Sequence, residues 1–231
     1  MLLEKLISLS HYLLPAQCIL CRSPAKSGLC VDCQKELPIL PHHCPRCAQF
    51  LTIPAACGKC LTTPPPFDCT YVLFPYQSPI AQLITELKFN GELSQATVLG
   101  RLLLQKIAQD WYRDKLLPEL IIPVPLHPQR LRERGFNQAI EIAKPIAKTL
   151  RIPLDRYGVV RIKHTAAQSS LAAKKRQQNI RQAFLATQNY PDKHIAVLDD
   201  VITTGNTVRE LSTVLKKQGA KRIDIWCIAR A

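Results

Sequence analysis

The chain has 231 residues, a hydrophobic content of 47% and a formal net charge of +14. These values are typical of a globular protein with room for one sizeable domain and a smaller one. No stretch reaches the roughly 18–20 apolar residues that a bilayer-spanning helix needs, which argues against an integral membrane protein.

Residues 1–14 are apolar but carry interspersed charge. Leu3, Leu6, Ile7 and Leu14 recur at helical spacing, and no cleavage site of the signal-peptide type follows. We therefore expect an amphipathic helix that packs on a domain rather than an export signal. On this basis the protein is expected to be cytoplasmic.

Eight of the ten cysteines form four Cys-x-x-Cys pairs between residues 18 and 60. Such a pair lets two thiolates reach one metal ion from a tight turn, and two pairs complete a tetrahedral structural zinc site. Four pairs predict two zinc ions, ahead of disulfides, which a reducing cytosol disfavours, and of an iron–sulfur cluster, which this spacing suits less well. The predicted ligands are Cys18, Cys21, Cys30, Cys33, Cys44, Cys47, Cys57 and Cys60.

The order in which the cysteine pairs combine stays open. Pairing along the chain would give a double zinc ribbon, and an interleaved pairing is the alternative. The module holds too little apolar material to fold by burial alone, so bound zinc would supply the missing stability. The triple proline at 64–66 marks a stiff linker. We expect a zinc-ribbon domain over residues 1–66 and a second domain over 67–231.

The first part of the second domain reads as helix, helix and strand. A helix is predicted over 83–89 with a turn at 88–91, and an amphipathic helix over 94–111. The apolar stretch 120–125 predicts a strand that leads into a stiff loop. A further helix, bent or interrupted by Pro145, is expected to run to about Leu150.

Residues 130–138 are predicted to form an arginine-rich loop. Arg130, Arg132 and Arg134 precede Gly135 and the start of a helix, an arrangement that binds anions. A solvated basic helix end is the alternative, because arginine is common on protein surfaces. The whole stretch 127–182 holds 13 basic residues against three acidic ones. Such a block can serve an anionic small molecule, a nucleic-acid backbone or solubility alone.

The most specific pattern spans residues 195–207. Its first four residues form a β-branched apolar run, typical of a strand buried on both faces of a parallel sheet. Asp199 and Asp200 follow at the strand's carboxyl end, where they can accept hydrogen bonds from sugar hydroxyls or hold Mg²⁺. The next loop opens a helix, whose N–H groups and dipole favour a phosphate. The loop residues are Thr203, Thr204, Gly205, Asn206 and Thr207.

The segment from Val197 to Thr207 resembles the phosphoribosyl pyrophosphate (PRPP) motif of type I phosphoribosyltransferases. The resemblance implies an α/β fold with a central, mainly parallel sheet flanked by helices. It implies that Asp199 and Asp200 bind the ribose with Mg²⁺, that the loop binds the 5′-phosphate, and that the arginine-rich segment binds pyrophosphate.

Residues 161–184 are polar, basic and poorly periodic. The same resemblance implies a mobile flap here, which closes over the reacting centre and excludes water. Its basic side chains are candidates for contacting pyrophosphate, a second anionic ligand or DNA, and a plain solvated helix is the alternative. These candidates are Lys163, Lys174, Lys175 and Arg176.

As a whole, the chain resembles the ComF family, through the four cysteine pairs, the Val124–Gln138 and Thr165–Asn179 segments and the PRPP motif. The resemblance implies a role in natural transformation and the handling of imported single-stranded DNA. Partners of such a protein would include PRPP, single-stranded DNA and a competence helicase or another DNA-processing protein.

Two functional hypotheses follow. In the first, the chain is a phosphoribosyltransferase: pyrophosphate leaves C1 of the ribose and a nucleophile adds there, although no general base or nucleobase pocket is recognisable. In the second, it is a non-catalytic sensor of PRPP or a nucleotide that binds single-stranded DNA or a competence protein through its basic surface and zinc ribbons. The aromatic content of 6% does not indicate extensive base stacking.

Overall fold

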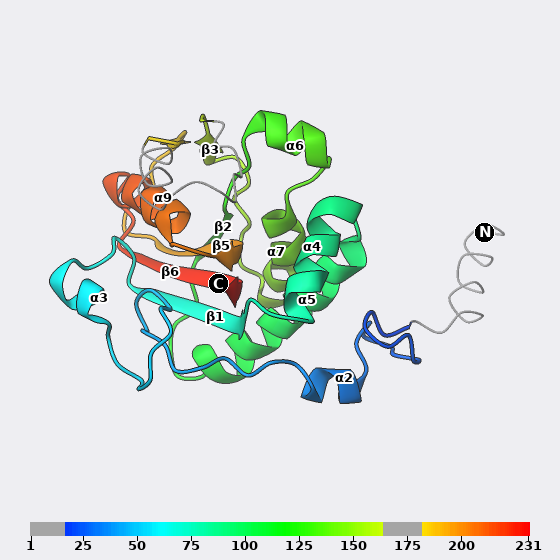
Figure 1. Cartoon of the computed structure of the whole chain (residues 1–231). Coiled ribbons are helices and arrows are strands. Elements are labelled where there is room, and N and C mark those ends of the chain that lie inside the picture. The colour runs from blue at the N-terminus through cyan, green and yellow to red at the C-terminus, as the bar shows by residue number, and fades with distance from the viewer. Residues whose placement is uncertain (1–16, 164–181) are drawn as a thin grey trace.

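The computed structural model of the protein describes residues 17–163 and 182–231. At its centre lies a four-stranded sheet in the order β1-β6-β5-β2, and its strand pairs in this part of the chain are parallel (Figure 1). The strands are β1 (Cys69–Pro75), β2 (Leu120–Pro123), β5 (His194–Ile202) and β6 (Arg222–Arg230). A separate antiparallel pair joins β3 (Val159–Arg161) to β4 (Phe184–Ala186). The predicted parallel α/β sheet is confirmed.

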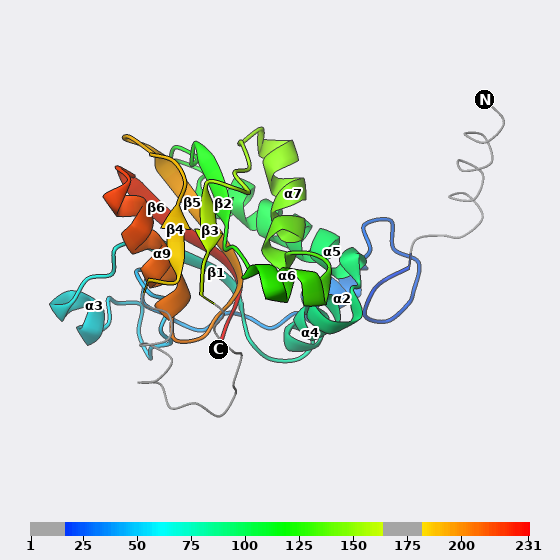
Figure 2. The same cartoon turned by 90° about the horizontal axis from the view of Figure 1, so that it is seen from above.

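Helices cover both faces of the sheet, as Figures 1 and 2 show. One face carries α4 (Ile80–Asn90), α5 (Leu93–Lys106) and α7 (Gln138–Leu150), and the other carries α9 (Asn206–Lys217). A π-helical turn, η1 (Ile107–Trp111), extends α5, and the short helix α6 (Pro128–Arg134) follows β2. Together these elements form a three-layered domain.

Strand β5 contributes to the core on both faces of the sheet. Ala196 and Leu198 belong to the apolar cluster that includes α4, α5 and α7, whereas Ile195 and Val197 belong to the cluster that includes α9. Successive side chains of a strand point to opposite faces, which explains the alternation. The expectation of a strand buried on both faces is confirmed.

The predicted turn at 88–91 is wrong in its first residues. Lys88 and Phe89 lie in the last turn of α4, which continues to Asn90. The helix ends at Gly91, whose φ of 69° lies in the left-handed region. Glycine adopts this conformation at the least cost, so the helix continues until it reaches one. As a result, Lys88 is held by a helix rather than by a loop.

Helix α7 continues through Pro145 and is not interrupted there. Helix α5 packs on this part of α7 through Gly100. A Cβ atom at that position would lie 2.6 Å from both the carbonyl oxygen of Ile142 and Cγ of Pro145. The missing side chain therefore allows the two helices to approach closely around the proline.

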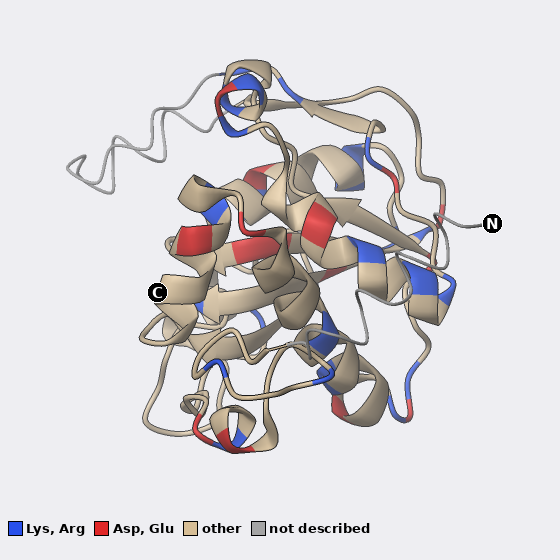
Figure 3. Ribbon diagram, turned by 90° about the vertical axis from the view of Figure 1, so that its right-hand side faces the viewer, with Lys and Arg blue, Asp and Glu red and all other residues tan. Residues whose placement is uncertain are grey.

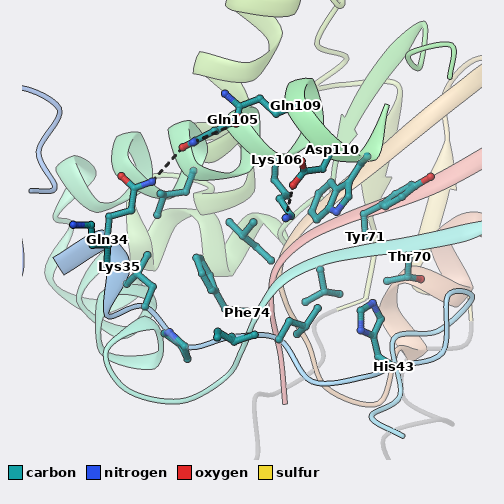
Figure 4. Close-up of a pocket in the computed structure, with 18 residues that line it drawn as sticks. Gln34, Lys35, His43, Thr70, Tyr71, Phe74, Gln105, Lys106, Gln109 and Asp110 are labelled. Carbon is teal, nitrogen blue, oxygen red and sulfur yellow. Dashed lines mark hydrogen bonds and ion pairs between the residues drawn. The ribbon is translucent and has the colours of Figure 1, made fainter. Parts of the chain in front are cut away.

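The amino-terminal module packs along the edge of the sheet. Its short helix α2 (Val31–Lys35) and the following segment 36–40 lie beside β1 and α5, and a groove of about 580 Å³ remains between them (Figure 4). The side-chain amide of Gln34 donates to Oε1 of Gln105 at 3.3 Å across this groove. The first zinc-ribbon half is thereby attached to α5.

Two further expectations concern the amino terminus and the membrane. The predicted helix at 1–14 lies outside the described residues. Within residues 17–163 and 182–231, no helix is long and apolar enough to cross a bilayer.

Candidate functional site

The eight predicted metal ligands form two separate tetrads. The first contains Cys18, Cys21, Cys30 and Cys33, and the second contains Cys44, Cys47, Cys57 and Cys60. In each tetrad the ligand atoms all lie within 4.8 Å of one another. The cysteine pairs therefore combine in the order of the chain, and the interleaved alternative is excluded.

The sulfur spacing in both tetrads fits zinc. The sulfurs of Cys21 and Cys30 are 3.6 Å apart, and so are those of Cys47 and Cys57. A tetrahedral zinc ion with Zn–S bonds of about 2.3 Å places its sulfur ligands about 3.8 Å apart. The tetrads are thus already close to the geometry that the metal requires.

One buried thiol in each tetrad favours the thiolate form that zinc binds, whereas neighbouring cysteines and burial raise the pKa values of Cys33, Cys47 and Cys60. Burial alone would raise the pKa of Cys18, but the backbone N–H groups of Cys21, Cys30 and Leu20 outweigh it and lower the pKa to about 6. Burial likewise opposes ionisation of Cys44, and neighbouring N–H groups lower its pKa to about 7. These two thiols can lose their protons to a metal near neutral pH.

A second candidate site lies at the carboxyl end of the sheet, where a cavity of about 460 Å³ opens. Its described lining includes four basic side chains and two acidic ones. The excess of positive charge favours an anionic ligand. The charged lining residues are Lys88, Arg130, Arg134, Arg161, Asp199 and Asp200.

Asp199 and Asp200 lie within β5, which extends to Ile202, rather than just after the strand. Both are buried, with exposed fractions of 9% and 3%. Lys88 of α4 forms an ion pair with Oδ2 of Asp200, and the side-chain amide of Gln138 donates to Oδ1 at 3.4 Å. The N–H of Asp200 donates to Oδ1 of Asp199 at 3.0 Å. The two carboxyl groups therefore occupy different electrostatic surroundings.

These surroundings separate the pKa values of the two acids. Burial, and then the neighbouring charge of Asp200, raise the pKa of Asp199 well above its ordinary value. Burial also opposes ionisation of Asp200, but the ammonium group of Lys88 outweighs it and lowers that pKa. Asp200 is thus the acid that carries charge first, and Asp199 keeps its proton to a higher pH.

The prediction of an arginine-rich loop is wrong, because residues 128–134 form helix α6. His127 caps the helix by accepting from the N–H of Gln129, proline occupies the first turn, and Gly135 ends it with a φ of 80°. The helix brings Arg130 and Arg134, one turn apart, to the cavity. Arg132 is exposed and is not among the described residues that line the cavity.

Three side chains at the cavity were not predicted as site residues. Lys88 and Gln138 contact Asp200, and Gln138 also accepts a hydrogen bond of 2.5 Å from Arg134. Arg161 lies at the end of β3, with its guanidinium carbon 5.6 Å from the centre of the Phe184 ring. The contacts with Asp200 and that of Arg161 with Phe184 join residues far apart in the sequence, so no local pattern could reveal them.

The predicted phosphate loop follows β5 directly. Thr203 and Thr207 line the cavity of about 460 Å³. Thr204 and Gly205 line a smaller cavity of about 190 Å³ beside the second tetrad. Gly205 has a φ of 76° and precedes α9, whose first residue is Asn206. The loop thus places the N-terminus of α9 at the cavity.

The flap candidates are only partly described. Lys163 is exposed and is not among the described residues that line the cavity at the carboxyl end of the sheet. Lys174, Lys175 and Arg176 lie outside the described residues, so their role as flap residues stays a prediction.

Two family models match this chain. A phosphoribosyl transferase domain matches residues 137–231, and a double zinc ribbon domain matches residues 9–61. Together with the parallel sheet and the two cysteine tetrads, they define a type I phosphoribosyltransferase-like domain that carries a double zinc ribbon.

Relatives of similar length match nearly the whole chain. Competence protein F of Haemophilus influenzae is 39% identical over 223 residues, which cover 93% of this chain and 97% of the relative. DNA utilization protein YhgH of Salmonella typhimurium is 34% identical over 221 residues, covering 94% and 97%. Competence protein ComFC of Bacillus subtilis is 24% identical over 205 residues, covering 83% and 79%. The chain belongs to the ComF family of competence proteins.

Zinc content tests the two tetrads. We expect two zinc ions per chain by elemental analysis, because each set of four thiols fits one tetrahedral ion. Cys21→Ser and Cys47→Ser should each lose one zinc ion and lower the thermal midpoint. One zinc ion shared by the whole module, or the visible absorption of an iron–sulfur cluster, would contradict the assignment.

The separated pKa values of the acids can be measured by carbon NMR of the aspartate carboxyl groups. We expect one resonance to titrate well above the range of ordinary carboxyls and to vanish in Asp199→Asn. In Asp200→Asn the pKa of Asp199 should fall, because the neighbouring like charge is removed. An ordinary pKa for Asp199 in the wild-type chain would contradict the effect assigned here to burial and to the charge of Asp200.

Proposed function

We propose that the cavity at the carboxyl end of the sheet binds PRPP together with Mg²⁺. The observation that carries the proposal is the placement of two buried acids beside the loop that opens α9, in a cavity that Arg130 and Arg134 also line. PRPP carries its ribose hydroxyls between a 5′-phosphate and a pyrophosphate group. Loop N–H groups, carboxyl groups and arginines would match these three parts in turn. In the same proposal the two tetrads hold structural zinc.

Each part of the ligand has a matching group in the cavity. Asp199 and Asp200 would accept hydrogen bonds from the ribose hydroxyls, and the loop from Thr203 to Thr207 would bind the 5′-phosphate. Arg130 and Arg134 would compensate the charge of pyrophosphate. Arg132 is exposed and is not part of the proposed site.

Mg²⁺ fits the donor set, because it prefers carboxylate oxygens and substrate phosphates. When bound, it would neutralise charge on the pyrophosphate group. The chain's own contribution is to hold the ribose and to place positive charge where the leaving group departs. Lys88 forms an ion pair with Asp200 and favours the ionised form of that carboxyl group. The residues present therefore favour binding and charge stabilisation.

Transfer to an acceptor would make the protein a phosphoribosyltransferase, a glycosyltransferase of the pentosyl type. In that reaction the bond from C1 of the ribose to pyrophosphate breaks, and a nucleophile forms a new bond at C1. Pyrophosphate release with a panel of acceptors tests this form of the proposal. PRPP binding without release of pyrophosphate would favour the hypothesis of a non-catalytic sensor.

We place this activity in the handling of imported single-stranded DNA. Relatives named as competence and DNA utilization proteins support this setting. Exposed basic side chains give the chain a means of contacting a nucleic-acid backbone, and Figure 3 shows basic positions on several elements of one side. The alternative is an adaptor that binds DNA or a competence helicase without catalysis. The exposed basic residues include Arg132, Lys144, Lys148, Arg151 and Arg156.

Calorimetric titration of Mg²⁺ and PRPP tests the proposed site. We expect Asp199→Asn and Asp200→Asn each to weaken binding at least tenfold, because each replaces a carboxyl oxygen by an amide while keeping the side-chain shape. Asp110→Asn is the matched control, since Asp110 pairs with Lys106 away from the cavity. Equal affinity in the wild type and the Asp199 and Asp200 variants would place the PRPP site elsewhere.

DNA binding can be tested separately by fluorescence anisotropy with a single-stranded oligonucleotide. We expect affinity to fall steeply with salt, with a logarithmic slope of about −0.7 per phosphate contact. Removing two exposed charges, as in Lys148→Ala with Arg151→Ala, should make the slope shallower, and Asp199→Asn should leave DNA binding unchanged. No detectable binding at low salt would contradict direct DNA contact.

A further inference from the structure

Arg230, the last residue of β6, joins the predicted phosphate loop to the amino-terminal module. Its side chain is buried, with an exposed fraction of 7%. One guanidinium nitrogen, Nη1, donates to the carbonyl oxygens of Ile202, at 3.2 Å, and of Thr203. The other, Nη2, donates to Oε1 of Gln49 at 3.2 Å. One side chain thus contacts the loop and the second zinc-ribbon half at once.

The contacts with Ile202 and Thr203 bear on how the loop can bind an anion. A phosphate is bound by backbone N–H groups, so the carbonyl oxygens of the same segment must point elsewhere. A buried carbonyl also needs a hydrogen-bond partner. Arg230 provides that partner for Thr203, and it adds a second donor to the Ile202 oxygen, which also accepts from the N–H of Ala231 at 2.9 Å. It therefore fixes the orientation of these peptide groups before any ligand arrives.

Gln49 is held by the second tetrad. The N–H of Cys44 donates to the carbonyl oxygen of Gln49 at 2.8 Å, closing the turn that carries the Cys44 and Cys47 ligands. This turn is attached to β1, because Thr70 donates through its N–H to Pro45 and through its hydroxyl to Arg46. The backbone that carries the Gln49 side chain is thus fixed by the turn of the second tetrad and by the sheet.

Apolar packing supports the same connection. Ala48, between Cys47 and Gln49, is fully buried and belongs to the apolar cluster that contains Ile202 and Val208. The cavity of about 190 Å³ beside the loop is lined by tetrad cysteines on one side and by Thr204 and Gly205 on the other. The second tetrad and the phosphate loop are direct neighbours.

The first tetrad has no such connection among the described residues. Its module packs on α5, where Arg101 donates to the carbonyl oxygen of Ser27 at 3.0 Å. Figure 4 shows a second contact, in which Gln34 donates to Gln105. Cys18 belongs to the cluster on the opposite face of the sheet. The two halves of the double ribbon therefore meet different parts of the second domain.

We propose that Gln49 and Arg230 are positioning residues for the phosphate loop, through which the second zinc tetrad, and not the first, sets the affinity for the 5′-phosphate of a ligand. The proposal rests on the proposed function of the cavity. It concerns the ligand's phosphate end alone, because Arg130 and Arg134 face the cavity from α6 and have no described contact with Arg230.

The experiment measures binding of two probes, ribose 5-phosphate and Mg²⁺-pyrophosphate, by calorimetry. Gln49→Ala should weaken ribose 5-phosphate about tenfold, since the guanidinium of Arg230 loses one of its acceptors, and leave pyrophosphate unchanged. Gln49→Glu keeps the acceptor and should retain affinity. Gln34→Ala, which removes the matching contact of the first tetrad, should change neither probe.

Three outcomes would overturn the proposal. Equal loss of both probes in Gln49→Ala would mean a general structural role, and unchanged binding of both would mean that the loop is set without the ribbon. Either result leaves the proposed function standing if the wild-type chain binds PRPP. A wild-type chain that binds neither PRPP nor either probe would overturn the proposed function together with this inference.

Discussion

Two adjacent buried carboxyl groups, Asp199 and Asp200, constrain the carboxyl edge of the sheet. Burying a charged group is costly unless other groups compensate it. Here the compensation comes from Lys88 of α4 and Gln138 of α7. Helices from two separate parts of the chain must therefore converge on one strand. The same convergence lines a cavity with basic side chains, which supports the proposal that it binds a phosphorylated sugar.

The double zinc ribbon has a structural consequence beyond its own fold. Its halves pack against different faces of the second domain, the first on α5 and the second beside the loop after β5. A module with little apolar material of its own contributes residues to both apolar clusters. Metal binding in the ribbon would therefore stabilise surfaces of the larger domain. The asymmetry between the halves gives the second one access to the proposed ligand loop.

Local patterns predicted much of this arrangement. The cysteine spacing identified all eight members of the tetrads, because ligands in one turn are close in sequence, and the apolar run before Asp199 identified a fully buried strand. Long-range contacts could not be predicted: nothing near Lys88 or Gln138 in the sequence shows that they meet Asp200. The charge of the arginine-rich segment predicts a loop, but the segment forms a helix that begins at Pro128 and ends at Gly135. That helix decides which arginines face the cavity.

A crystal structure of the wild-type chain with PRPP and Mg²⁺ is the most direct test of the central claim. The account predicts electron density in the cavity at the end of β5, with the 5′-phosphate against Thr203–Thr207, the ribose hydroxyls at Asp199 and Asp200, and pyrophosphate facing Arg130 and Arg134. Density for PRPP at another location, such as the groove between β1 and α5, with the cavity unchanged, would contradict it.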